Sequence, residues 1–558
     1  MGARVDGPHL LRRAGSPAAA AALLALLPLA FLAVFFVLPL LGMLGRGFVT
    51  DGALDLSGVG DVLGRSRTAR VLAFTAGIST LATAVTLALG VPTAYVLHRL
   101  RVPGAGLLRA LVVMPFVMPT VVVGVLWRGL LASSGPLGGL GLDGSWVAIL
   151  LAMVFFNVAV VVRTVGAAWD GLDPRTAQAA AALGASPGHV LRTVTLPALR
   201  PAVVSAASVV FLFCSTAFGV VLTLGGLRYA TVETEIYLLT TSLLDLQGAA
   251  VLSVLQLVVV VTLLVLSERT RSRARGVRRR SRASVPRVPV ARRHLPALVV
   301  TAVAVLLVLA PLVGGVVRSL RRGSTWTLAN YAQLTSEVPG TGASAWHALG
   351  TSWRIAVDAA LLALVLGLLV ALAVTRRPRS RRGRSVLATL DATFMLPLGV
   401  SAVTIGFGFL ITLDRPPLDL RSTPLLVPVA QAMVALPLVV RTIAPVLRDV
   451  DRRQGEAAAT LGASPLRAWA TVELPVLWRP LLAAVGFALA VSLGEFGATA
   501  FLARPDEPTL PVLVYTLMGR PGAEAQGGAM AAAVLLAAVT VAVMGLVERL
   551  RLSSVGAF

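Results

Sequence analysis

One polar stretch occurs twice in this sequence and decides the fold. The first copy, Asp173–Pro187, reads DPRTAQAAAALGASP, and the second copy, Asp451–Pro465, reads DRRQGEAAATLGASP. Aspartate is a good helix N-cap, the alanine run favours helix, and the glycine that follows can end the helix in a left-handed conformation. Serine and proline then cap and start a second helix, which we expect Pro197 and Pro475 to stop. Each copy therefore predicts a helix, a turn and another helix.

The two copies belong to a longer repeat, in which the second half of the chain follows the first at the constant offset that pairs Asp173 with Asp451. Matched positions outside the polar stretches are Val161–Thr164 with Val439–Thr442, Leu196-Pro197 with Leu474-Pro475, Phe218-Gly219 with Phe496-Gly497, and Pro119 with Pro397. The identities include arginine, aspartate, serine, glycine and proline, so apolar composition alone does not explain them.

The composition indicates a polytopic membrane protein. Of the 558 residues, 57% are hydrophobic and 13% are charged, whereas an ordinary soluble protein is about 25% charged. A spanning helix needs about 20 apolar residues. We expect an all-α fold of about 12 transmembrane helices, in two six-helix repeats that run parallel in the membrane. The expected spans lie near 18–44, 69–98, 107–130, 146–168, 201–224, 247–267, 296–318, 353–375, 386–412, 425–447, 480–503 and 527–547.

The basic residues predict the orientation. The net charge is +24, and all 49 basic residues are arginine because the chain has no lysine. With both termini in the cytosol, 35 of the arginines fall on the cytosolic side, which is a positive-inside signal. We divide the chain into a first repeat (1–267), a linker (268–295) and a second repeat (296–558). The linker contains Arg278–Arg280 but no aromatic residue to stack on a base, so we interpret it as a connector and expect no nucleic-acid partner.

The residue inventory argues against catalysis by this chain. Without lysine there is no Walker A loop, so we do not expect the chain to hydrolyse ATP by itself. Cys214 is the single cysteine, and the five histidines are scattered without a metal-binding spacing. We therefore expect no catalytic residue, no metal site and no cofactor.

The two polar stretches resemble the signature of ABC importer permeases, E-A-A-x3-G-x9-hydrophobic-x-L-P. In that family the segment is the coupling helix, which docks in a groove of the ATPase subunit, and the resemblance implies this role for loops at about 170–197 and 448–475. The second loop matches the signature in full, while the first has glutamine in place of the glutamate. The matching residues are Gln178, Ala179, Ala180 and Gly184 in the first loop, and Glu456, Ala457, Ala458 and Gly462 in the second.

Further stretches resemble one branch of that family, the fused double permeases for ferric iron and thiamine. They are Phe155–Asn157, Leu224–Gly226, Thr231–Tyr237, Ser492–Gly497 and Thr509–Pro511. The resemblance implies a multi-pass permease subunit in the cytoplasmic membrane, with two ATPase domains and an extracytoplasmic solute-binding protein as partners. Ferric iron is the first expectation for the solute and thiamine the alternative. A secondary transporter also uses paired six-helix halves, but it offers no reason for two capped cytosolic loops.

Polar residues inside the apolar segments are candidates for the translocation pathway. Glu495 either faces the pathway, where it would favour a cationic solute, or caps a helix near the outer membrane surface. Asn157 and Gln431 either bond between helices or contact the solute. The outer loops 225–245 and 504–525 are candidate docking surfaces for the binding protein. Their acidic residues available for pairing are Glu233, Glu235, Asp506 and Glu507.

Overall fold

The computed structural model describes residues 17–50, 53–54, 57–226, 228–275, 287–376, 380–414, 419–421 and 423–552. Most of these residues are helical, and the strands within them form two short hairpins. The all-α, polytopic fold is therefore confirmed. The arginine run Arg278–Arg280 of the expected linker lies outside the described residues.

The first half contains the following elements: α1 (Pro17–Leu32), η2 (Ala33–Val37), α2 (Leu38–Phe48), β1 (Val49–Thr50), β2 (Ala53–Leu54), α3 (Ser57–Gly64), α4 (Ser66–Arg99), α5 (Ala105–Val113), η3 (Met114–Val117), α6 (Thr120–Leu131), η4 (Gly138–Leu140), α7 (Trp146–Asp170), α8 (Pro174–Ala182), α9 (Pro187–Val190), η5 (Leu191–Thr195), α10 (Leu196–Ser215), α11 (Gly219–Leu224), α12 (Val232–Thr241) and α13 (Leu246–Arg275).

The second half repeats this order: η6 (Arg292–His294), α14 (Leu295–Ser319), β3 (Arg321–Arg322), β4 (Thr325–Trp326), α15 (Ala329–Ala332), η7 (Gln333–Thr335), α16 (Ala345–Val374), α17 (Arg381–Met395), η8 (Leu396–Gly399), α18 (Ala402–Thr412), α19 (Leu426–Asp449), α20 (Arg452–Thr460), α21 (Pro465–Ala468), η9 (Trp469–Glu473), α22 (Leu474–Gly494), α23 (Thr499–Leu502), α24 (Leu510–Met518) and α25 (Ala523–Leu552).

Ten helices in the described part of the chain are long and apolar enough to cross a membrane. The two other expected spans, 107–130 and 386–412, are broken. In the first, the segments Ala105–Val117 and Thr120–Leu131 meet at 108°. In the second, the 3₁₀ turn η8 separates α17 from α18. Proline lies in both 3₁₀ turns, and it lacks the N–H that a continuous helix needs.

The two breaks also correct the repeat alignment locally. Pro115 is the second residue of η3, and Pro397 is the second residue of η8. The structural counterpart of Pro397 is therefore Pro115. The expected pairing of Pro397 with Pro119 is wrong. Equivalent residues of the two halves differ more in residue number at the broken spans than at the polar loops.

The expectation that Pro197 and Pro475 stop a helix is also wrong. Each proline is preceded by a π-helical turn, in which Leu196 N–H donates to the Leu191 carbonyl and Leu474 N–H to the Trp469 carbonyl. A π turn lets the helix continue past a residue that cannot donate to the preceding turn. The fifth and eleventh spans therefore run through these turns, as Pro187–Ser215 and Trp469–Gly494.

The first helix of each half packs on the other half. Helix α1 lies along α16, and α2 contacts α18 as well as α13. Reciprocally, α14 lies along α4 and α6. The largest buried cluster also combines first-half side chains with second-half residues such as Phe496 and Leu510. The two halves thus share one interior.

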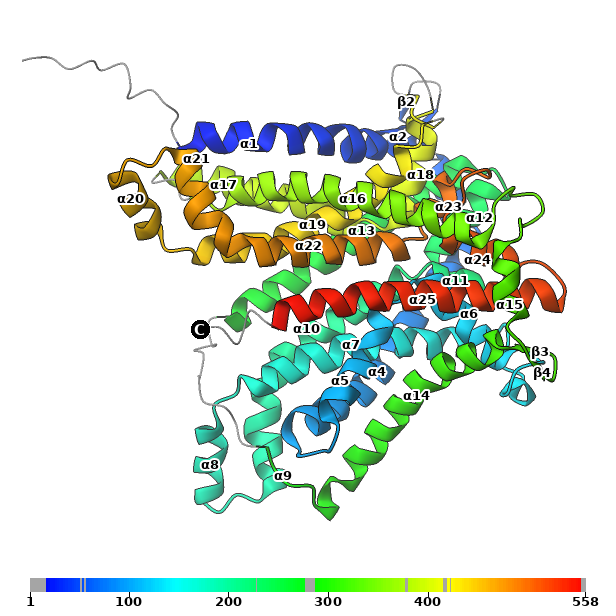
Figure 1. Cartoon of the computed structure of the whole chain (residues 1–558), viewed down its shortest axis with the longest axis horizontal. Helices are drawn as coiled ribbons and strands as arrows, with labels where there is room; N and C mark the ends of the chain where they lie inside the picture. The colour runs from blue at the N-terminus through cyan, green and yellow to red at the C-terminus, as the bar shows by residue number, and fades with distance from the viewer. Residues whose placement is uncertain are drawn as a thin grey trace, which may run out of the picture.

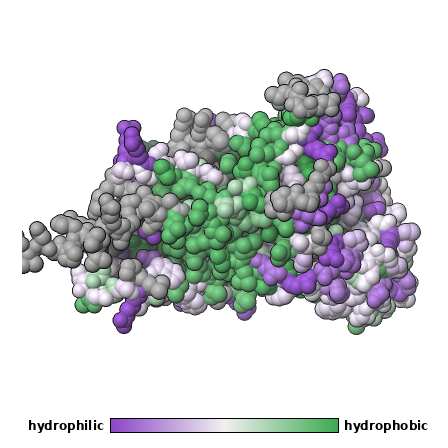
Figure 2. All heavy atoms as spheres, turned by 90° about the horizontal axis from the view of Figure 1, so that it is seen from above, coloured by the Kyte–Doolittle hydropathy of each residue, from purple (hydrophilic) through white to green (hydrophobic). Residues whose placement is uncertain are grey.

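The molecule has two distinct ends (Figure 1). The helices α8–α9 and α20–α21 lie at one end, on opposite sides of the molecule, and we call this the loop end. The opposite end carries α12, α15, α24 and the β3–β4 hairpin, and we call this the far end. Figure 2 shows a broad hydrophobic band across the middle of one face, with hydrophilic side chains gathered toward the far end. Such a band fits the apolar layer of a bilayer.

Candidate functional site

The two polar loops at the loop end have the same hydrogen-bonded caps. The Asp173 side chain accepts a hydrogen bond from Arg175 N–H (2.9 Å), and the Asp451 side chain accepts one from Arg453 N–H (3.0 Å). Asp173 and Asp451 are therefore N-caps, as predicted. These bonds satisfy N–H groups that the first helical turn cannot pair internally.

The short helices α9 and α21 are capped in the same way. The Ser186 hydroxyl accepts from His189 N–H (3.4 Å), and the Ser464 hydroxyl accepts from Arg467 N–H (3.3 Å). The predicted serine caps are therefore confirmed in both loops.

The helices α8 and α20 both end in the predicted left-handed glycine. Gly184 has a φ of 86° and Gly462 a φ of 83°. After α8, Ala185 N–H donates to the Ala180 carbonyl (3.1 Å) and Gly184 N–H to the Ala181 carbonyl (3.0 Å). The equivalent bonds follow α20, and both pairs are the two bonds of a Schellman motif. The two turns therefore have the same shape.

All eight residues predicted from the coupling signature lie on these two helix-turns. The structure brings each set together on one exposed surface at the loop end, in which the side chains are exposed or half-buried. They are Gln178, Ala179, Ala180 and Gly184 on one loop, and Glu456, Ala457, Ala458 and Gly462 on the other.

Sequence reasoning did not single out the most exposed apolar residues of the loops. Leu183 is 89% exposed and Leu461 is 88% exposed. Each leucine directly precedes the left-handed glycine, so the turn holds it away from the protein. Their identical place in both copies of the repeat was the available signal. Two large apolar side chains kept in water at matched positions indicate a surface that another protein covers.

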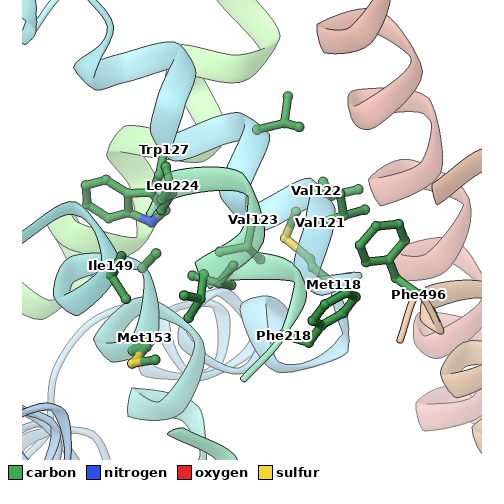
Figure 3. Close-up of a cluster of buried hydrophobic side chains, with 14 of the residues drawn as sticks. Met118, Val121, Val122, Val123, Trp127, Ile149, Met153, Phe218, Leu224 and Phe496 are labelled. Carbon is green, nitrogen blue, oxygen red and sulfur yellow. The ribbon is translucent and has the colours of Figure 1, made fainter. Parts of the chain in front are cut away.

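A second pair of matched residues meets where the halves join. Phe218 precedes α11 and Phe496 precedes α23, and the two are paired by the same offset as the polar loops. Their ring centroids lie 5.4 Å apart with an interplanar angle of 22°, which is a stacked arrangement. Figure 3 shows the two rings between ribbons of the two halves, with Met118 beside them. Both rings are buried.

Glu495 lies next to this stacked pair, and it is 7% exposed. Its carboxylate accepts hydrogen bonds from Ala498 N–H (2.8 Å), Thr499 N–H (3.1 Å) and the Thr499 hydroxyl. It therefore caps the start of α23. Gln431 extends the group, because its amide donates to the Thr499 hydroxyl at 3.4 Å.

Asn157 is buried within the first half and is not part of the Glu495 group. Its amide donates to the Met153 carbonyl (2.9 Å) and lies 3.5 Å from the Cys214 sulfur. The Asn157 Oδ1 atom is buried without a hydrogen-bond partner among the described residues. An unpaired buried acceptor is costly, so this atom is available to a bound group.

Two acidic residues expected at the outer surface are buried instead. Glu233 accepts from the Gln256 amide and from the Ser401 hydroxyl (2.8 Å), which links the two halves. Glu235 pairs with Arg67 through two hydrogen bonds. Both belong to α12, which packs into the protein, so the prediction that they are available to a binding protein is wrong. Asp506 and Glu507 pair with Arg504 and Arg354 near the surface.

A cavity of about 500 Å³ lies at the far end, where residues of both halves meet. Its polar lining includes Arg128, Asp143 and Thr223 from the first half, and Tyr515 and Arg520 from the second. Small-molecule sites commonly measure about 300–1,000 Å³. Among the described residues, no group of three or more His, Cys, Asp or Glu side chains could hold a metal ion.

Comparison with known proteins identifies what the chain is similar to. The family model described as the binding-protein-dependent transport system inner membrane component matches residues 88–273 and 363–551. The thiamine transport system permease protein of Salmonella typhimurium is 31% identical over 455 residues, covering 79% of this chain and 81% of the relative. That of Escherichia coli is 30% identical over 465 residues, with the same coverage. That of Brucella abortus (strain 2308) is 29% identical over 508 residues, covering 88% and 89%.

Proposed function

We propose that this chain carries thiamine across the cytoplasmic membrane. The premise is its family: the chain belongs to the binding-protein-dependent transport system inner membrane components. The chain is an ABC importer permease, with two copies of the family segment in one polypeptide. In this proposal both loops dock on ATPase domains, and a solute-binding protein delivers thiamine to the far end.

The observation that carries the proposal is the pair of matched loops with their exposed leucines. Leu183 and Leu461 lie at the same end of the molecule, each held outward by a Schellman turn. Two equal anchors suit a partner that presents two equal grooves, such as a pair of ATPase domains. Burying a leucine side chain at an interface gains about 1.5–3 kcal/mol. ATP-driven closure of the two domains would move both loops, and with them the spans that run through the π turns.

The solute assignment rests on the relatives. Those compared above are named as thiamine permeases, so they favour thiamine, the alternative expectation, over ferric iron. Thiamine carries a positive charge, and the buried carboxylate of Glu495 lies beside the junction of the halves. We assign Glu495 and Asn157 to the translocation pathway, with Glu495 supplying negative potential and the Asn157 Oδ1 atom an acceptor for the solute.

The orientation follows from charge. The loop end faces the cytosol in this proposal, and both termini are cytosolic, because that placement puts 35 of the 49 arginines on the inner side. The far end then faces the binding protein, and its cavity of about 500 Å³ receives the solute.

The test is docking and uptake by the whole complex. Leu183→Asp and Leu461→Asp should each weaken co-purification of the ATPase and reduce ATP-driven uptake of radiolabelled thiamine at least about tenfold, since one buried leucine contributes about 1.5–3 kcal/mol. Leu140→Asp is the matched control, because Leu140 is 62% exposed but belongs to η4, outside both loops.

Two outcomes would contradict the proposal. Unchanged ATPase capture by the Leu183 and Leu461 variants would exclude the docking role. Thiamine uptake that survives ATP depletion but collapses with an ionophore would indicate a secondary transporter instead.

A further inference from the structure

Four aromatic residues occupy matched positions around the junction of the halves. Phe218 and Phe496 form the central stack, and each also contacts a tyrosine of its own half. Phe218 lies 5.4 Å from Tyr237, at 61°, and Phe496 lies 5.6 Å from Tyr515, at 53°. Tyr237 and Tyr515 are paired by the same sequence offset as the two phenylalanines. The four rings therefore follow the internal symmetry of the chain, and we call them the aromatic quartet.

Close backbone packing fixes the two phenylalanines of the quartet. A Cβ added to Gly219, which follows Phe218, would lie 2.5 Å from the Thr120 hydroxyl and 3.0 Å from the Val121 nitrogen. A Cβ added to Gly497, which follows Phe496, would lie 3.0 Å from the Ala402 Cβ atom. Thr120 and Ala402 are the first residues of α6 and α18. The segment that contains each phenylalanine therefore packs closely against α6 or α18, the helices that follow the breaks in the two broken spans.

The quartet lies between the far-end cavity and the buried interior. Tyr515 is half-buried and lines the cavity, while Phe496 behind it is 2% exposed and Phe218 is 6% exposed. In Figure 3 the two phenylalanine rings meet face to face, with Met118 and Val122 beside them. A constriction of apolar rings offers no hydrogen bond to a hydrated ion, and such constrictions close pores by excluding water.

The same rings can bind one class of solute when they separate. Aromatic rings stack on other flat rings, and their faces attract cations. A flat ring that carries a positive charge gains both interactions. It could take the place of one phenylalanine against the other, with a tyrosine at each side. The two phenylalanine rings have no oxygen or nitrogen atom with which to bind a small hydrated metal ion, and such an ion has no ring to stack on them.

We propose that Phe218, Tyr237, Phe496 and Tyr515 form the gate of the far-end cavity, and that this gate selects aromatic cations by exchanging ring–ring stacking for ring–solute stacking. This inference rests on the proposed transport of thiamine for its solute class, whereas the closure of the cavity by the rings is independent of that assignment. When the gate is closed, the stacked phenylalanine rings seal the path of the solute. When the gate is open, the faces of the rings line that path.

The first test measures closure with the full chain alone. Liposomes containing the chain are loaded with radiolabelled thiamine, and efflux is followed without ATP. Phe218→Ala combined with Phe496→Ala should raise efflux at least about tenfold over the native chain. Phe218→Leu combined with Phe496→Leu should stay near the native rate, because leucine still fills the space. Efflux from the alanine pair at the native rate would overturn the gate.

The second test measures selection with the complete importer. Phe218→Leu combined with Phe496→Leu should lower ATP-driven thiamine uptake at least about tenfold, since the cation–ring contact is lost. Phe218→Tyr keeps the ring, so its uptake should stay within about threefold of the native rate. Phe31→Leu with Phe35→Leu is the control, because those two rings contact each other at 5.1 Å within the first span. Thiamine uptake at the native rate by the variant with Phe218→Leu and Phe496→Leu would overturn the selection of the solute by the rings.

The two tests separate this inference from the proposed function. If the native complex drives no thiamine uptake, the thiamine assignment fails, and the efflux comparison still decides whether the quartet is a gate. Native-like ATPase capture by each variant shows that the chain has folded.

Discussion

Phe218 and Phe496 occupy equivalent positions in the two halves and stack with their ring centroids 5.4 Å apart. Because each has the same place in its half, the contact joins the two repeats at their internal symmetry axis. The glycine after each phenylalanine lies close against a neighbouring helix: an added Cβ would lie 2.5 Å from the Thr120 hydroxyl at Gly219 and 3.0 Å from the Ala402 Cβ atom at Gly497. A side chain at either glycine would therefore crowd the helix that holds the neighbouring phenylalanine in place.

Gly219→Val should disrupt this arrangement. The new side chain would meet Thr120 and Val121, whose atoms lie 2.5 and 3.0 Å from the position that a Cβ would take, and overpacking of this kind costs about 1–3 kcal/mol. We expect a lower melting temperature in detergent and reduced thiamine uptake. Gly139→Val is the control, because nothing lies within 4 Å of a Cβ at Gly139. Equal melting temperatures for the two variants would contradict the prediction.

Gly184→Ala and Gly462→Ala should weaken the docking loops without disturbing the membrane helices. Both glycines have positive φ, and a left-handed conformation costs a residue with a Cβ about 1–2 kcal/mol. Affinity for the ATPase should fall several-fold in each variant, measured by titration of the solubilised chain. Gly188→Ala serves as the comparison, since Gly188 lies in α9 with open space around it. Loss of affinity in all three variants would indicate a general effect of the loop sequence.

Glu495→Gln should lower both stability and thiamine affinity. The carboxylate accepts from two backbone N–H groups and one hydroxyl, whereas glutamine offers a single acceptor oxygen. Leaving a buried donor unpaired costs about 1–3 kcal/mol. We expect a reduced melting temperature, and a raised KM for thiamine because the negative charge is lost. A lower melting temperature with unchanged KM across pH would restrict Glu495 to capping α23.

Asp245→Asn should show a pH-dependent effect on stability. Burial acts to raise the pKa of Asp245, but hydrogen bonds from Arg65 and from Gly248 N–H, with the charge of Arg65, outweigh it and lower that pKa. A lowered pKa stabilises the folded chain at pH values above the unfolded value of about 3.9, and the stabilisation is lost as the pH falls through the folded value. The partly exposed Arg65–Asp245 pair, at 2.6 Å, should contribute up to about 1 kcal/mol.

Melting temperatures of the native chain and the Asp245→Asn variant check this prediction. The native chain should be the more stable at pH 7, and the difference should shrink as the pH falls below about 3.9. A difference that stays constant down to pH 3 would mean that the ion pair does not cause it.

The local features of the fold could be predicted from the sequence, because short-range bonds create them. The caps at Asp173 and Asp451 and the left-handed turns at Gly184 and Gly462 depend on neighbours within a few residues, and all four are confirmed. The membrane character also follows from composition. The roles assigned to the eight coupling residues remain predictions.

The features that sequence reasoning missed depend on packing between distant segments. An apolar window spans both sides of Met118-Pro119 equally well, so it does not reveal the 108° bend between Val117 and Thr120. Glu233 reads as a polar residue of an outer loop, and only its contacts with Gln256 and Ser401 explain its burial. The phenylalanines were visible in the repeat, but their mutual contact requires the symmetry of the folded chain.

The exchange of first helices between the halves constrains the order in which this protein can be assembled. Helix α1 ends at Leu32, while its partner α16 begins only at Ala345. During synthesis, α1 must therefore wait in the lipid, already inserted, until the chain has been made as far as α16. Two separately synthesised halves would each emerge with an unfilled place for the other's first helix. They should therefore associate by interlocking, each supplying the missing helix of its counterpart.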